Sequence, residues 1–449
     1  MDPLSVVNRR GGRVGVILSA FGTCVTVGDK LSGRRRATGQ KTYTMALGSG
    51  PSMATETDSP ADLRSDAIDW SEVDDGRLAA SRRTQAFVAA LCVLVALFVY
   101  DTVTGYDLWI GAWYTSSRID WLYLVSLVVF AFYVVVPLAR NRERTVQYWR
   151  RFRTNRLAVL CLLYLVVFLG LGTASLLVLG RPEINIQYSY QPPLFFTIEA
   201  GTIAQNCAGQ VTGPPIEQYC HGSLRFPLGT NLSGQSMLGL ALAGMGVALV
   251  VALVTSMIMV PIATVVGVTA GYSGGWVDDA LMRYVDIQQT VPAFLIYILL
   301  SLVYGASLFL IVLTFGLLSW GGVARLVRSE VKKRREELYI TAAESAGASR
   351  LRIVRKHILP NVSNTVVTAT TRQIPFLILA EAAIAFIGKI GDENVPSWGE
   401  AIALGFDVSR FPRTWWLVAV PAVFLVVTVF SFSVVGDALR DTLDPRGEA

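Results

Sequence analysis

A charged stretch of this chain, Glu336 to Asn361, lies between two long apolar runs. Its sequence is EELYITAAESAGASRLRIVRKHILPN, and a basic segment that begins at Arg325 leads into it. A charge at the centre of a bilayer is costly, so this stretch must lie in water. Lys and Arg are enriched in the cytoplasmic loops of membrane proteins. The sequence therefore predicts a cytoplasmic loop between two membrane-spanning helices.

The overall composition agrees with a membrane protein. Hydrophobic residues make up 53% of the 449 residues and charged residues only 16%, whereas soluble domains contain roughly 25% charged residues. Much of the net charge of +6 comes from Arg and Lys beside apolar runs. Such charge indicates orientation and contact with anionic lipid headgroups rather than nucleic-acid binding. We therefore predict an all-α polytopic membrane protein.

The charged loop has a predicted structure of its own. Glu336 to Ala346 is rich in helix formers, and Gly347 can adopt the left-handed conformation that ends a helix. A second helical run from Arg350 is expected to end at Pro360. Small residues cluster at the end of the first helix. This pattern predicts a compact element that the backbone of another protein could approach closely.

These residues resemble a known family. TAAESAG at 341–347, followed by HILPN at 357–361, is similar to the EAA loop of permease subunits of ATP-binding-cassette (ABC) importers, in the dipeptide/oligopeptide/nickel branch. Thr341 stands where that family usually has Glu. Further similar segments are RFRTNRLA at 151–158, FPLGTN at 226–231, GYSGGWVDD at 271–279, PSWG at 396–399 and GDALRDTLDPR at 436–446. The resemblance covers residues 148–446 and implies a type I ABC importer permease fold with a six-helix core.

The apolar runs predict eight spans. They lie near 85–100, 121–139, 157–179, 245–268, 287–303, 308–324, 366–387 and 415–435. The first two, within 81–140, are additional to the six-helix core, and the coupling loop covers 325–361. Residues 237–245 are expected along the outer interface, 271–279 to form a turn-rich connector, and Pro292 to kink the fifth span. Seven arginines within 140–156 mark that segment as cytoplasmic, which predicts a plasma-membrane protein with both termini in the cytoplasm.

The N-terminal segment differs from the rest of the chain. Residues 1–80 are predicted to be disordered and cytoplasmic, because they are polar and rich in Gly, Ser, Thr and charged residues. The composition changes at Met53, where an acidic segment begins. Translation is therefore expected to start at Met45 or Met53. Residues up to 52 would then be an upstream extension that results from assigning the start codon too early.

The chain lacks the Gly-x-x-x-x-Gly-Lys-Ser/Thr loop that binds nucleotide phosphates. It is therefore predicted to be a non-catalytic subunit without a cofactor of its own. The resemblance implies two partner ATPase subunits that bind ATP and Mg, a second homologous permease and an extracytoplasmic solute-binding protein. The residues expected to form the ATPase-coupling surface are Glu337, Leu338, Thr341, Ala342, Ala343, Ser345, Ala346, Gly347, Leu359 and Pro360.

Polar residues within apolar runs are candidates for a substrate path. The seventh span contains Arg372, Gln373 and Glu381. Arg372 and Glu381 are too far apart to pair within one helix, so each could instead bond to a neighbouring helix. The resemblance, which places an acidic residue in this neighbourhood, favours an architectural role over direct substrate contact.

Two cysteines, Cys207 and Cys220, lie in a polar segment predicted to be external, where a disulfide is chemically possible. Cys207, Cys220 and His221 could also indicate a metal site, but no fourth ligand lies nearby, and we predict none.

The predicted function is the permease subunit of an ATP-driven ABC importer for dipeptides or oligopeptides, which forms half of the translocation pathway. Nickel or another small solute is an alternative substrate. A second reading is an ion- or proton-coupled secondary transporter with Arg372 and Glu381 in a proton relay, although the chain shows no internal repeat. A membrane-embedded enzyme is a third reading, for which the sequence offers no catalytic constellation.

Overall fold

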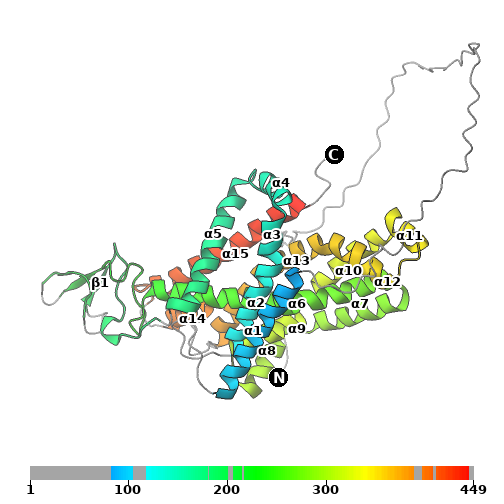
Figure 1. Ribbon diagram of the computed structural model, residues 1–449. Helices are drawn as coiled ribbons and strands as arrows, with labels where there is room; N and C mark the ends of the chain where they lie inside the picture. The colour runs from blue at the N-terminus through cyan, green and yellow to red at the C-terminus, as the bar shows by residue number, and fades with distance from the viewer. Residues whose placement is uncertain are drawn as a thin grey trace, which may run out of the picture. The chain divides into compact units, whose positions relative to one another are not determined.

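The computed structural model describes residues 82–104, 118–179, 182–200, 206–214, 217–388, 397–407 and 411–443. This part of the chain is helical, apart from one small sheet (Figure 1). The predictions for residues 1–80, which concern disorder and the translation start, fall outside the described residues.

Seven helical segments in the described ranges are long and apolar enough to cross a membrane. They are Arg82–Thr104 (α1), Ile119–Arg140, Arg156–Leu177, Met237–Ser273 (α6), Leu308–Arg335, Arg350–Ile387 and Trp416–Leu443 (α15). A bent pair, α7 (Gly275–Thr290) and α8 (Ala293–Tyr304), meets at 65° and would make an eighth segment if it counts as one span. The chain is therefore a polytopic helical membrane protein.

Several of these segments combine shorter elements. Ile119–Arg140 consists of α2 (Arg118–Phe130), the π-helical turn η2 (Ala131–Val135) and α3 (Val136–Arg140). It is followed by α4 (Arg142–Phe152), α5 (Arg156–Ala174) and the π-helical turn η3 (Ser175–Leu179). Further along the chain come α9 (Leu308–Leu318), α10 (Gly321–Arg335), α11 (Leu338–Ser345), α12 (Arg350–Ile353), the π-helical turn η6 (Val354–Ile358), α13 (Leu359–Gly388) and α14 (Trp398–Asp407).

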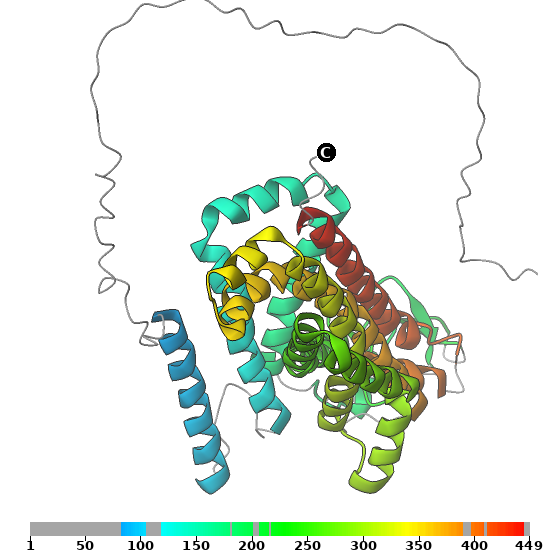
Figure 2. The same ribbon diagram turned by 90° about the vertical axis from the view of Figure 1, so that its right-hand side faces the viewer.

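The 37-residue helix α6 lies at the centre of the bundle, and Figure 2 looks nearly along its axis. It packs against α10, α9, α5, α13 and α2. Two glycines explain how closely α10 approaches. A Cβ atom on Gly267 would lie 2.7 Å from the carbonyl oxygen of Ala324, and one on Gly271 would lie 2.8 Å from that of Arg328. Small residues one turn apart thus let the two backbones touch.

The start of α6 differs from the prediction. Met237 and Leu240 are buried, and they pack in one cluster with Tyr190 and Trp416. The expectation that residues 237–245 lie along a membrane interface is therefore wrong, because protein covers these first turns.

The prediction of a turn-rich connector at 271–279 is also wrong, because the connector in the structure is much shorter. α6 continues to Ser273, and only Gly274, with a φ of +66°, separates it from α7. By contrast, the break expected at Pro292 is confirmed, since Val291 and Pro292 separate α7 from α8.

The segment before α6 carries the sheet. It contains the 3-10 turn η4 (Ile186–Tyr188) and the strands β1 (Thr197–Glu199), β2 (Val211–Thr212) and β3 (Tyr219–His221). The strand order is β1-β3-β2, and both pairings are antiparallel. The indole Nε1 of Trp416 donates to the carbonyl oxygen of Thr230 at 3.2 Å, which ties this segment to the start of α15.

Candidate functional site

The short helix α11 has one buried and one exposed face. Ile340 is 1% exposed and packs with Ile353 and Ile358. Leu338 is 86% exposed, and the other residues on that side also lie at the surface, namely Thr341, Ala342, Ser345 and Ala346. Ala343 differs from its predicted outward position. It lies three residues after Ile340, on the same face of the helix, and packs against the same cluster.

The turn after α11 is the glycine turn that the sequence predicts. Gly347 has a φ of +79°. Its N–H donates to the carbonyl oxygen of Glu344 at 2.9 Å, and the N–H of Ala348 donates to that of Ala343 at 3.1 Å. These two bonds define a Schellman motif. Ala343 and Ala348 also pack against the buried cluster beneath the loop, so the motif fixes the end of α11 to its base.

The residues around Pro360 hold α11 against the next helix. The rings of Tyr339 and His357 lie 6.1 Å apart. The side-chain amide of Asn361 donates to the carbonyl oxygen of His357 at 2.7 Å and to the hydroxyl of Tyr339 at 3.3 Å. Leu359 and Pro360 are exposed beside these contacts.

The predicted end of the second helical run at Pro360 is wrong. Helix α13 includes Pro360 and continues to Gly388. The π-helical turn η6 ends one residue before Leu359. A π turn widens the hydrogen-bond ladder at the point where the proline ring and its missing N–H would disturb an α-helix.

An ion-pair clamp fixes the base of the loop. The carboxylate of Asp278, near the start of α7, is 5% exposed. Its Oδ2 accepts a hydrogen bond from Nη2 of Arg328 at 2.6 Å and lies 2.6 Å from Nζ of Lys332. In the sequence, Asp278 precedes the apolar run at 287–303 that is expected to span the membrane. The hydrogen bond from Arg328, with that from Lys332, keeps the pKa of Asp278 below its ordinary value of 3.8, although burial opposes this effect. The clamp joins α7 to α10, the helix that leads into α11.

The structure separates the three candidate path residues of α13. Arg372 lies with its Nε 3.7 Å from Oδ1 of Asp437 on α15, and both side chains are more than half exposed. Gln373 is half-buried. Glu381 is 4% exposed and forms a side-chain hydrogen bond with Ser397, directly before α14. Arg372 and Glu381 therefore bond to different neighbours, and Glu381 connects α13 to α14.

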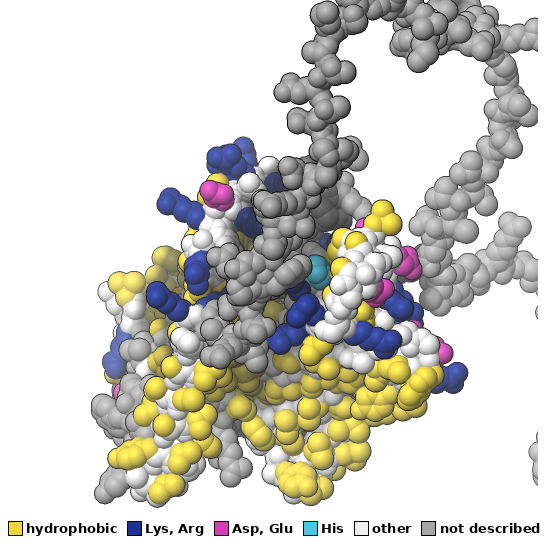
Figure 3. Space-filling view, turned by 45° about the vertical axis from the view of Figure 1, so that its right-hand side comes forward, with side chains coloured by type: hydrophobic (Ala, Val, Ile, Leu, Met, Phe, Trp, Pro, Cys, Tyr) yellow, Lys and Arg dark blue, Asp and Glu magenta, His cyan; other side chains and the backbone are white. Residues whose placement is uncertain are grey.

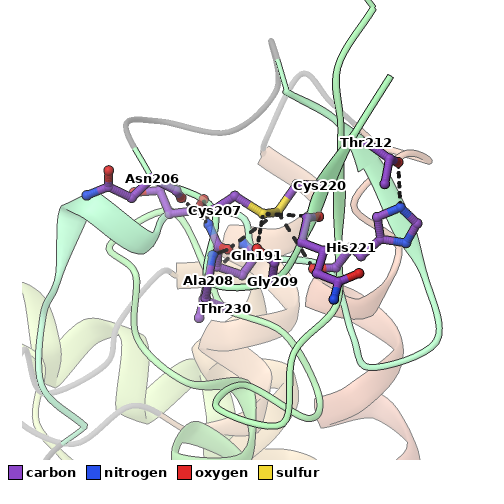
Figure 4. The surroundings of a disulfide bond; sticks show 11 residues. Gln191, Asn206, Cys207, Ala208, Gly209, Thr212, Cys220, His221 and Thr230 are labelled. Carbon is purple, nitrogen blue, oxygen red and sulfur yellow. Dashed lines mark hydrogen bonds between the residues drawn. A yellow bond between two sulfur atoms is a disulfide. The ribbon is translucent and has the colours of Figure 1, made fainter. Parts of the chain in front are cut away.

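Cys207 and Cys220 form a disulfide bond (Figure 4). Gln191 lies beside it and is 2% exposed. Its Oε1 accepts from the backbone N–H of Ala208 at 2.8 Å, and its Nε2 donates to the carbonyl oxygen of Asn206 at 2.9 Å. Because the disulfide uses both thiols, neither can serve as a thiolate ligand. In the ranges that the structure describes, no group of three or more His, Cys, Asp or Glu could hold a metal ion.

Sequence reasoning missed Asp278, Tyr339 and Asn361. Asp278 and Asn361 lie in segments that carry the family resemblance, and Tyr339 lies two residues before another such segment. For Asp278 the sequence offered only an acidic residue a few positions after a long apolar run, in a chain with a strongly basic loop. The contacts of Tyr339 depend on two helices meeting, which no local pattern encodes.

The fold and the loop define a class: a polytopic membrane protein whose water-exposed loop rests on a rigid base. Comparison with known proteins is more specific. The model of the family "Binding-protein-dependent transport system inner membrane component" matches residues 263–448. The oligopeptide transport system permease protein OppC of Haemophilus influenzae is 35% identical over 218 residues, which cover 49% of this chain and 70% of the relative.

Two further relatives match a larger part of the chain. OppC of Escherichia coli is 32% identical over 297 residues, which cover 66% of this chain and 89% of the relative. The dipeptide transport system permease protein DppC of Bacillus subtilis is 28% identical over 301 residues, covering 66% and 84%. This chain thus belongs to the family of binding-protein-dependent transport system inner membrane components. Members of this family are transport subunits.

Proposed function

We propose that this chain is the permease subunit of an ATP-driven importer and forms half of its translocation pathway. Residues 148–446 form a type I permease with a six-helix core, to which the two helices within 81–140 are added. The eight spans leave both termini in the cytoplasm of a plasma-membrane protein. Separate ATPase subunits bind ATP and Mg and dock on the loop at 325–361, so this chain does no catalysis. A second permease and an extracytoplasmic binding protein complete the assembly.

The observation that carries this proposal is the construction of the loop. Its outer face, from Leu338 to Gly347, is exposed and consists mainly of small residues. Its inner face is fixed by Ile340 and by the Schellman motif. Beneath it, Asp278 clamps α7 to α10. An element of this kind can transmit the movement of a docked partner to the spans as a rigid body.

The substrate class follows from the relatives. Their names refer to oligopeptide and dipeptide transport, and we propose peptides for this chain as well. Nickel or another small solute is the alternative within the same mechanism. A proton-coupled carrier is less well supported, because Glu381 bonds to Ser397 and Arg372 lies near Asp437. These contacts connect helices rather than form a relay.

Uptake into proteoliposomes tests the proposal. The vesicles would contain this chain with its partner permease, ATPases and binding protein. They would be offered a labelled dipeptide, a longer peptide or nickel, with and without ATP. We expect peptide accumulation only with ATP. Uptake driven by an ion gradient without ATP would overturn the proposal.

Two matched substitutions test the role of the loop. Ala342→Trp adds bulk to the exposed face of α11, whereas Ala89→Trp adds the same bulk to an exposed position of α1. Ala342→Trp should greatly reduce the amount of peptide transported per ATP hydrolysed, because the indole would stand between the loop and the docked ATPase. Ala89→Trp should leave that ratio unchanged. Equal effects of the two variants would contradict the assignment of the docking surface.

A further inference from the structure

The short helix α4 joins two membrane-spanning segments at one side of the bundle (Figure 1). It follows Arg140, the last residue of the second candidate span, after a break at Asn141 with φ −97° and ψ 56°. It ends at Phe152, and three residues separate it from Arg156, where the third candidate span begins. A helix that connects the ends of two adjacent spans lies near the level of the lipid headgroups.

One side of α4 is apolar and attached to the bundle. Phe152 is 7% exposed and packs in one cluster with Ala158 and Val435. The ring of Trp149 stacks on that of Phe152 with centroids 6.1 Å apart. Trp149 and Tyr148 remain 45% and 37% exposed. Aromatic rings of this kind are enriched at membrane–water interfaces.

The other side of α4 is strongly basic. An open cleft of about 710 Å³ lies in the bend between α3 and α4, and four arginines and a single glutamate line it. Its lining residues are Arg140, Asn141, Arg142, Glu143, Arg144, Val146, Gln147 and Arg150. In Figure 3, Lys and Arg side chains gather at the top of the molecule, the height at which α4 lies in Figure 1, above a broad apolar area.

These four arginines are available to a ligand. Within the described residues, none of them forms a salt bridge with a carboxylate. Helix α15, which packs against α4, carries Asp437 and Asp441, but neither lines the cleft. Several cations around one cleft repel each other unless an anion is present. Guanidinium groups match the oxygens of a phosphate group in geometry and charge.

We propose that this cleft binds the phosphate headgroup of an anionic phospholipid such as phosphatidylglycerol. A lipid fits better than a free phosphate because the cleft includes Arg140, the last residue of the second candidate span, and because the same short helix carries the exposed rings of Tyr148 and Trp149. The acyl chains would then continue along the apolar surface below. The proposal does not depend on peptide transport, so it can fail or hold independently of the proposed function.

Native mass spectrometry of the purified full-length chain in detergent tests the proposal. The chain would be titrated with phosphatidylglycerol or with zwitterionic phosphatidylcholine, and the apparent Kd of the first bound lipid would be measured. We expect the anionic lipid to bind at least about 25-fold tighter, since each basic residue near a surface contributes about a fivefold factor toward anionic lipid. The double variant Arg142→Gln/Arg144→Gln should weaken the first phosphatidylglycerol by about 25-fold on the same basis.

Two controls make the result specific. Arg283→Gln/Lys333→Gln removes the same charge from exposed positions outside the cleft and should change the Kd less than twofold. Arg142→Lys/Arg144→Lys keeps the charge and should retain most of the preference, which separates loss of binding from loss of folding. An equal loss in both glutamine variants, or no preference in the wild type, would overturn the site. Effective competition by millimolar glycerol phosphate or inorganic phosphate would overturn the lipid as its ligand.

Discussion

Replacing Gly347 tests whether the coupling loop depends on a left-handed residue. Its φ is +79°, and a Cβ atom added there would meet no other atom within 4 Å. The whole effect of Gly347→Ala must therefore come from the backbone, where a left-handed alanine costs about 1–2 kcal/mol. That free energy corresponds to a roughly 5- to 30-fold higher population of the opened turn. Gly347→Asn should be much milder, because asparagine adopts this conformation more easily.

Hydrogen exchange measures this opening directly. Three amides close the turn: those of Ala346, Gly347 and Ala348, which donate to the carbonyl oxygens of Ala342, Glu344 and Ala343. In Gly347→Ala these amides should exchange roughly 5- to 30-fold faster than in the wild type. In Gly347→Asn they should exchange at nearly the wild-type rate. Mass spectrometry of a peptide that spans residues 338–350 resolves the difference.

The outcome also bears on coupling. In proteoliposomes, the amount of substrate transported per ATP should fall in the order wild type, Gly347→Asn, Gly347→Ala, because an opened turn no longer fixes the face that docks. Unchanged exchange in Gly347→Ala would refute the backbone argument. Faster exchange with normal transport would refute the claim that the rigid turn is needed for coupling.

Three further predictions concern the scaffold. Gly271→Ala should destabilise the bundle by about 1–3 kcal/mol, because its Cβ would overpack against α10. In the control Gly170→Ala on α5, the added Cβ would have no atom within 4 Å. That variant should show no decrease in the midpoint of thermal unfolding. Asp278→Asn should cost roughly 1–3 kcal/mol, less than a fully buried pair because its partners are partly exposed. Since the pKa of Asp278 is lowered by folding, that difference should be constant above about pH 5 and shrink as the pH falls below about 4. Replacing both Cys207 and Cys220 by serine, which opens a loop with a sequence separation of 13, should destabilise the sheet segment by about 3 kcal/mol, as limited proteolysis would detect.

The main features of the loop could be predicted from local sequence. The helix end at Gly347 and the small residues before it could be predicted from a few neighbouring positions, because a Schellman motif involves only the residues at the end of one helix. The inward position of Ala343 follows from Ile340 three residues earlier and could have been deduced. The clamp at Asp278 could not, because its partners lie about fifty residues away on another helix.

The error at Pro360 has a different origin. Proline usually ends or kinks a helix, and the chain gives no local sign that a π-helical turn precedes it. Similarly, the apolar run that begins at Met237 is longer than one span, and its first turns are interior because the sheet segment and the start of α15 pack over Met237 and Leu240. In both cases tertiary structure overrides a local preference.

The two added N-terminal spans show that hydropathy alone cannot predict whether a span is buried in the helix bundle. α1 and the second span are similarly apolar, yet no residue of α1 is buried, whereas Tyr123 in α2 is 2% exposed. Lipid tails are as apolar as a protein core, so apolar residues alone cannot distinguish the two surroundings. Polar atoms can. The hydroxyl of Tyr123 hydrogen-bonds to that of Thr173 on α5 at 2.9 Å, and such a bond offsets the cost of burying a hydroxyl away from water. The second span is therefore built into the bundle, whereas α1 contacts α2 and buries no residue of its own.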